Sequence, residues 1–205
     1  MTSMIDDPKS YFRDFIPPRD ELLHELEQQA HEENIPIVGP VVGELLYILA
    51  KATNSRTILE LGTATGYSAI YLARGLIGLN GKVTTLERDK TMAIRATENI
   101  ARAGLTDRIE VIMGEVNETL EKLEPFFDFI FMDIDKEDYA AALPTCRELL
   151  RLGGILVVDN VAFKRAREFN QMIFKDDRWR SVLLYSFLPQ HSPEQDGLTL
   201  AVRVE

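Results

Sequence analysis

Two aspartates and a lysine follow a strongly apolar stretch in the segment FMDIDK, residues 131–136. Asp133 and Asp135 are separated by one isoleucine, and Lys136 comes directly after them. Burying an unpaired carboxylate is costly, so a strand in a protein core does not normally end in charges. These three charges therefore either mark the place where a strand reaches water or hold a ligand.

The segment ELGTATGYS carries a second group of chemically suggestive residues. Glu60 and Gly62 end an apolar run, Gly66 allows a close turn, and Ser68 is predicted to open the next helix as its N-cap. The spacing Gly-x-x-x-Gly differs from the Gly-x-Gly-x-x-Gly of dinucleotide sites. A glutamate at this turn would repel a pyrophosphate but would suit an amino or sulfonium cation. The alternative interpretation is a tight turn without a ligand.

Two further carboxylates end apolar runs. Glu87 follows KVTTL, where a carboxylate can accept hydrogen bonds from both hydroxyls of a ribose. Glu115 and Val116 follow RIEVIMG, where a carboxylate and the backbone would meet the edge of an adenine. Acids at strand ends are common, so each is weak evidence alone. With the glycine turn they describe a pocket for an adenosine that carries a cationic tail and no diphosphate, which S-adenosylmethionine fits.

Strands alternating with helices would bring these residues together. Five near-continuous apolar runs are typical of strands buried on both faces, and a helical stretch follows each one; they are 57–61, 82–87, 108–114, 127–133 and 153–159. This alternation predicts a doubly wound, mostly parallel α/β sheet. The runs SVLLYSFL and LTLAVRV have only a polar loop between them, so we expect them to add an antiparallel pair at the edge of a seven-stranded sheet. Ligands of such sheets bind beyond the carboxyl ends of the strands.

The chain of 205 residues is expected to form one domain, 1–205, with an N-terminal helical cap over 1–52 and an α/β core over 53–205. No apolar run is long enough to cross a membrane. The start of the chain has no signal-peptide pattern, and the single cysteine, Cys146, is predicted to be buried; both features favour a cytoplasmic location. A net charge of −10 disfavours a nucleic-acid partner.

Four segments, in this order and spacing, resemble the cation-dependent O-methyltransferases: ILELGTATGYSAIYLA, VTTLE, FDFIFMDIDK and VVDN. That family includes catechol O-methyltransferase, the plant caffeoyl-coenzyme A enzymes and many bacterial relatives. The resemblance extends from Ile35 to the C-terminus. It implies a class I methyltransferase fold, S-adenosylmethionine as the methyl donor, a divalent cation and a homodimer.

The resemblance also assigns roles to residues. It implies that Asp133, Asp159 and Asn160 bind the cation, and that Lys136 acts with Asp133 in catalysis. Two carboxylates and an amide oxygen suit Mg²⁺, Ca²⁺ or Mn²⁺, and no His or Cys is expected to join them in a zinc site. A dication beside Lys136 would favour its neutral form, so that it accepts a hydroxyl proton before in-line methyl transfer. The residues that the resemblance places around S-adenosylmethionine are Val38, Glu60, Gly62, Thr63, Gly66, Ser68, Glu87, Glu115, Val116, Asp133 and Asp135.

The sequence departs from the family in the loop before the last predicted strand. Pro189 and Gln190 stand where catechol O-methyltransferase has a substrate-binding glutamate. The candidates to replace that glutamate are His191, Glu194 and Gln195. The identity of the substrate is therefore the part of the function that the sequence defines least.

The leading hypothesis is a Mg²⁺-dependent O-methyltransferase that acts on a catechol-like small molecule. A first alternative is methylation of a wobble 5-hydroxyuridine in tRNA, which a basic patch of Lys164, Arg165 and Arg167 facing the metal would favour. A second is a protein that binds S-adenosylmethionine without catalysis. A nicotinamide dehydrogenase is disfavoured because the Gly-x-Gly-x-x-Gly motif is absent.

Overall fold

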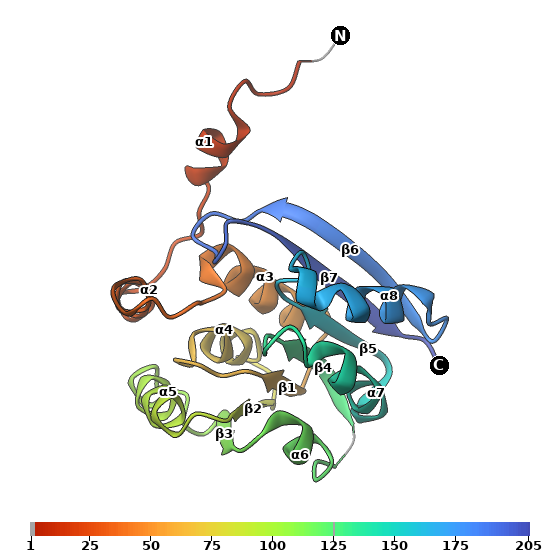
Figure 1. The fold of residues 1–205 in the computed structure, drawn as a ribbon. Helices are drawn as coiled ribbons and strands as arrows, with labels where there is room; N and C mark the ends of the chain where they lie inside the picture. Colours follow the sequence, from red (N-terminus) through yellow and green to blue (C-terminus); the bar gives the residue numbers. More distant parts are fainter. Residues whose placement is uncertain (1–2, 125) are drawn as a thin grey trace.

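A computed structural model describes residues 3–124 and 126–205. Its centre is a seven-stranded sheet in the order β3-β2-β1-β4-β5-β7-β6 (Figure 1). The strands are β1 (Thr57–Leu61), β2 (Lys82–Glu87), β3 (Ile109–Met113), β4 (Phe127–Met132), β5 (Leu150–Val158), β6 (Trp179–Phe187) and β7 (Gln195–Arg203). The first five are parallel, β7 runs antiparallel to both β5 and β6, and β6 forms one edge. The predicted doubly wound sheet with an antiparallel end is confirmed.

Helices cover both faces of this sheet (Figure 1). They are α1 (Pro8–Arg13), α2 (Glu21–Glu33), α3 (Gly39–Ala52), α4 (Tyr67–Gly75), α5 (Lys90–Arg102), α6 (Val116–Leu120), α7 (Tyr139–Leu149) and α8 (Arg167–Lys175), with a 3₁₀ turn at Lys164–Ala166 before α8. None of the helices described is long and apolar enough to cross a membrane.

Strand β4 shows how the sheet separates two hydrophobic cores. Phe129 and Phe131 point to the core that also holds apolar residues of α2, α3, α4 and α5. Ile130 and Met132 point to the opposite core, built with α6, α7 and α8. Successive residues of a strand face opposite sides, so these four side chains divide between the two cores. All four are fully buried. Cys146 is buried in the second core, as predicted.

The beginning of α4 differs from the prediction. Ser68 was expected to be the N-cap, but α4 begins at Tyr67 and its N-cap is Gly66, in the left-handed region with φ +83°. Glycine adopts this conformation without the steric cost that a side chain brings. Ser68 therefore lies in the first turn of the helix. By contrast, Asp20 and Asp89 cap α2 and α5 through their carboxylates, a pattern that side-chain type does reveal.

The order of the strands reverses between β1 and β4. Leu61 at the end of β1 pairs with Met132 at the end of β4, and Met132 in turn pairs with Val158 of β5. The residues that follow these strand ends, Gly62, Asp133 and Asp159, therefore leave the sheet side by side.

Candidate active site

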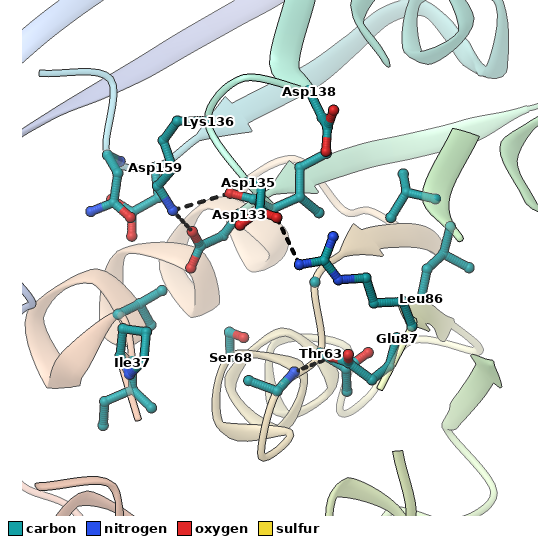
Figure 2. A pocket seen from close by; sticks show the side chains of 18 of the residues that line it. Ile37, Thr63, Ser68, Leu86, Glu87, Asp133, Asp135, Lys136, Asp138 and Asp159 are labelled. Carbon is teal, nitrogen blue, oxygen red and sulfur yellow. Dashed lines mark hydrogen bonds and ion pairs between the residues drawn. The ribbon is translucent and has the colours of Figure 1, made fainter. Parts of the chain in front are cut away.

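A cavity lies at the carboxyl ends of β1, β2, β4 and β5, where the strand order reverses (Figure 2). All but two of the predicted site residues line it: Val38, Gly62, Thr63, Ser68, Glu87, Glu115, Val116, Asp133, Asp135, Lys136, Asp159 and Asn160. The two exceptions are Glu60 and Gly66. Figure 2 shows Asp133, Lys136 and Asp159 together at one end of the cavity and Glu87 at the other. Residues from six separate segments thus converge at the position that open α/β sheets use for ligands.

The turn after β1 brings two strand ends into close contact. Gly62 has φ +96°, and a Cβ atom at this position would clash with the backbone oxygen of Asp133. The glycine therefore allows the β1–α4 turn to pack directly against the segment that carries Asp133. The amide of Gly66 closes the turn by donating to the carbonyl of Thr63 at 2.8 Å.

Glu60 lies behind the cavity wall and is fully buried. Its Oε2 accepts a hydrogen bond from Thr85 Oγ1 at 2.6 Å, and Thr85 Oγ1 also lies 2.6 Å from Thr63 Oγ1, on the cavity wall. Burial raises the pKa of Glu60 to about 7, although the hydroxyls of Ser68 and Thr85 favour the charged form. Its Oε1 has no hydrogen-bond partner in the part of the chain that is described. Contact between Glu60 and a ligand thus stays a prediction.

Glu87 is held by the backbone at the end of β2. Its Oε2 accepts from the amide of Ala64 and its Oε1 from the amide of Asp89, both at 2.8 Å. Each carboxylate oxygen has a second lone pair, so the group can still accept hydrogen bonds from a ligand in the cavity. The two backbone bonds hold the carboxylate in one orientation on the cavity wall.

Asp133 and Lys136 form an ion pair on the cavity wall. Lys136 Nζ lies 3.0 Å from Asp133 Oδ1 and also donates to the carbonyl of Ile134 at 3.1 Å. Burial raises the pKa of Asp133, the nearby charge of Asp159 raises it further, and Lys136 opposes the shift. Two neighbouring carboxylates that repel one another are stabilised by a positive charge beside them, and the lysine supplies part of it.

Asp159 is held from the loop between β6 and β7. His191 Nε2 lies 3.0 and 2.8 Å from the two oxygens of Asp159, and His191 Nδ1 donates to the carbonyl of Pro193 at 2.7 Å. Burial acts to lower the pKa of His191, but the hydrogen bond and charge of Asp159 outweigh it and raise the pKa. The sequence prediction did not foresee this pair, because 32 residues separate its members along the chain.

The two aspartates and Asn160 fit a hard divalent cation by their chemistry. Carboxylate and amide oxygens are the ligands of Mg²⁺ and Ca²⁺, and both carboxylates here are occupied by cationic or hydrogen-bonding groups that a dication would replace. Among residues 3–124 and 126–205, no three His, Cys, Asp or Glu side chains converge on one point. A divalent cation at Asp133, Asp159 and Asn160 therefore stays a prediction.

None of the three candidates for substrate binding, His191, Glu194 and Gln195, is among the residues that line the cavity. Glu194 pairs with Arg13, at 2.7 and 2.6 Å, and Gln195 accepts from Lys9 at 3.0 Å. Ser192 does line the cavity, although the sequence did not single it out. Arg88, also missed, lines the cavity and forms an ion pair with Asp135 at 2.7 Å; its place directly after Glu87 was the available signal.

Solved structures with the same architecture were found by comparison. An O-methyltransferase from Bacillus cereus in complex with S-adenosylhomocysteine has a TM-score of 0.84 and 33% identity, with 95% of this chain and 96% of that chain covered. The O-methyltransferase TomG from Streptomyces achromogenes, in complex with S-adenosylmethionine, has a TM-score of 0.85 and 28% identity, with 96% of each chain covered.

Curated relatives give the same picture. A catechol O-methyltransferase from Niastella koreensis is 33% identical over 212 residues, which cover 94% of both chains. A catechol O-methyltransferase from Mycobacterium tuberculosis is 44% identical over 120 residues, 58% of this chain and 54% of that relative.

The strand order, the glycine turn and the acidic cavity define an α/β methyltransferase. A sequence model of the O-methyltransferase family matches residues 17–204, and the chain belongs to this family. The predicted class, an S-adenosylmethionine-dependent O-methyltransferase, is thereby confirmed.

Proposed function

We propose that this protein is a divalent-cation-dependent O-methyltransferase that methylates a hydroxyl of a catechol-like small molecule. The observation that carries the proposal is the group at one end of the cavity: Asp133 paired with Lys136, beside Asp159 and Asn160. The two relatives named catechol O-methyltransferase support the same class of acceptor.

The part of the cavity next to the glycine turn suits the methyl donor, S-adenosylmethionine, which supplies the methyl group from its sulfonium. Gly62 and Thr63 line this part of the cavity, and the fixed carboxylate of Glu87 would accept hydrogen bonds from the ribose hydroxyls. Glu115 and Val116, after β3, would contact the adenine, and Asp135 with Arg88 lines the same cavity. Val38 is buried at the start of α3 and offers an apolar contact.

Asp133, Asp159 and Asn160 would hold the divalent cation, which lowers the pKa of a bound hydroxyl when present. Lys136 Nζ lies beside Asp133 and is the nearby basic group for taking the hydroxyl proton. The remaining contribution of the protein is alignment, because holding acceptor and donor in line removes much of the entropic cost of the reaction.

A tRNA acceptor has less support. Lys164, Arg165 and Arg167 are exposed, but none of them lines the cavity, and Arg165 pairs with Glu137 at 2.9 Å. The net charge of −10 also opposes a polyanion. We therefore place a small hydroxylated molecule first, in a cytoplasmic homodimer whose residues 1–52 cap an α/β core.

Methyl transfer with Mg²⁺ or with EDTA tests the proposal. Labelled methyl from S-adenosylmethionine should reach one of a panel of catechols in Mg²⁺ and fall to background in EDTA. Lys136→Met should lower kcat by about 10²–10⁴-fold, the range typical of a lost general base, while the affinity for S-adenosylhomocysteine changes little.

A matched control is Lys122→Met, because Lys122 is exposed and lies outside the cavity. Equal activity in Mg²⁺ and EDTA would contradict the cation requirement. Label that appears only on hydroxylated tRNA would replace the small-molecule acceptor by the nucleic acid.

A further inference from the structure

The carboxylate of Asp196 touches Asn160, the proposed amide ligand of the cation. Asp196 is the second residue of β7 and is fully buried. Its Oδ2 accepts from Asn160 Nδ2 at 2.6 Å, and its Oδ1 accepts from the amides of Gly197 at 2.6 Å and Ala162 at 3.2 Å. The Asp196 carboxylate therefore accepts all three of these hydrogen bonds, and each of its oxygens accepts at least one.

These bonds decide which way the Asn160 amide faces. A carboxylate cannot donate, so the NH₂ group of Asn160, and not its oxygen, must face Asp196. The same Nδ2 also lies 3.3 Å from the carbonyl of Ser192, which takes the second hydrogen. With both hydrogens held on this side, Asn160 Oδ1 must point away from Asp196, and Asn160 lines the cavity together with Asp133 and Asp159.

The backbone around Asn160 also packs against the beginning of β7. Asn160 has φ +52°, a left-handed conformation that asparagine tolerates better than most residues. Val161 then donates to the carbonyl of Gly197 at 3.0 Å, and a Cβ at Gly197 would lie 2.9 Å from Val161 Cγ2. The beginning of β7 is thus packed tightly against the turn that carries Asn160.

We propose that Asp196 is a positioning residue for the cation site: it fixes the Asn160 carboxamide with its oxygen toward the cation. This inference rests on the cation site of the proposed function. Partners that orient metal ligands commonly change metal affinity about 10–100-fold when they are removed. Asp196 would hold the site in this way without touching the cation.

An isosteric exchange tests the inference. In Asp196→Asn, the new amide keeps its oxygen for the two backbone donors and turns its NH₂ toward Asn160, whose own amide must then reverse and point NH₂ at the cation. We expect Mn²⁺ to bind about 10–100-fold more weakly, measured by the electron paramagnetic resonance signal of free Mn²⁺. The double variant Asn160→Asp with Asp196→Asn restores an oxygen on the cation side at unchanged net charge, and should recover most of the affinity.

Asp128→Asn is the control for the lost charge. Asp128 accepts from Arg151 and from the amides of Arg56 and Thr57 at the opposite end of the sheet, so Mn²⁺ affinity should stay within about twofold, less than the 10–100-fold expected of a lost ligand partner. Affinity for S-adenosylhomocysteine reports whether each variant is folded. A second measurement needs no change at position 196: the Asn160 Nδ2 protons of the wild type should exchange slowly with solvent by NMR and persist when Mg²⁺ is added.

The outcomes separate the inference from the proposed function. If the wild type binds Mn²⁺ and Asp196→Asn binds it with the same affinity, the positioning role is overturned and the cation site stays in place. Loss of affinity without recovery in the double variant, or fast exchange of the Asn160 protons, would also overturn it. A wild-type protein that binds no Mn²⁺ would overturn both.

Discussion

Glu60 shows what burial does to a single charged residue next to the site. Its side chain is fully buried, and its pKa is raised to about 7 from an ordinary value of 4.5, with burial as the largest cause. The folded chain therefore binds the carboxyl proton of Glu60 more tightly than the unfolded chain does. Folding stability must fall as the pH rises from 4.5 through 7, and the full cost applies above that window.

We predict that Glu60→Gln removes this dependence on pH. A shift of this size corresponds to about 3 kcal/mol of unfolding free energy at alkaline pH and to little at pH 5, as an order of magnitude. The variant should thus gain stability relative to the wild type between about pH 5 and pH 8. Urea unfolding at both pH values measures the difference. Glu110→Gln, at an exposed position of β3, is the control for the loss of a carboxylate.

Single residues were predictable when their type and local place carried the signal. Asp133, Asp159 and Glu87 end apolar runs, and a buried charge at a strand end is a local, visible anomaly. Asp196 and His191 act on Asn160 and Asp159 across 36 and 32 residues of sequence. They stand in a polar loop or at a strand start, where a charged residue is ordinary. Only the fold shows that they are buried.

The β1–α4 turn is the element that joins the two halves of the site. Its close approach to β4 requires that Gly62 have no side chain, both because φ is +96° and because a Cβ would meet the backbone of Asp133. Gly104, after α5, also has a positive φ of +69° but has open space around it. A side chain at Gly104 would therefore cause backbone strain alone, whereas a side chain at Gly62 would cause both backbone strain and a steric clash.

We predict that Gly62→Ala destabilises the fold more than Gly104→Ala. Both changes place a side chain in a left-handed conformation, at about 1–2 kcal/mol, and only Gly62→Ala adds an overpacking cost of about 1–3 kcal/mol. Urea unfolding measures the two losses. Gly62→Ala should also weaken the binding of S-adenosylhomocysteine, and Gly104→Ala should leave it unchanged. Equal losses in both assays would show that β1 and β4 can separate at no cost.

Elements were predictable to the extent that their signals are local. Buried parallel strands are continuous apolar runs, so the strands were found, although β5, β6 and β7 begin before the predicted residues. The N-terminus of α4 was misplaced because Gly66, and not a polar side chain, caps it. A glycine at a cap has no side chain that signals its role, whereas the carboxylates of Asp20 and Asp89 do signal theirs.

At the scale of the whole molecule, an apolar cluster near the N-terminus lies outside the two cores. Helix α1 has no buried residue and stands away from the body at the end of the N-terminal arm (Figure 1). Tyr11, Phe12 and Phe15 are 42%, 53% and 59% exposed, and their rings pack on each other, with centroids of Tyr11 and Phe15 4.8 Å apart. Arg13 ties α1 to Glu194 in the loop beside the site. A second copy of the chain would bury these rings in the homodimer expected from the family.

We predict that the protein sediments as a dimer and that Phe12→Ser with Phe15→Ser shifts it to the monomer. Because Phe12 and Phe15 are both more than half exposed in the single chain, the melting temperature of the monomer should depend little on these two side chains. Ile94→Ser is the matched control: Ile94 is 52% exposed on α5, so its loss removes a similar apolar surface away from the arm. Two subunits of net charge −10 repel, so added salt should favour the dimer. A wild-type monomer at every concentration, or a dimer unaffected by the double substitution, would exclude α1 as the contact.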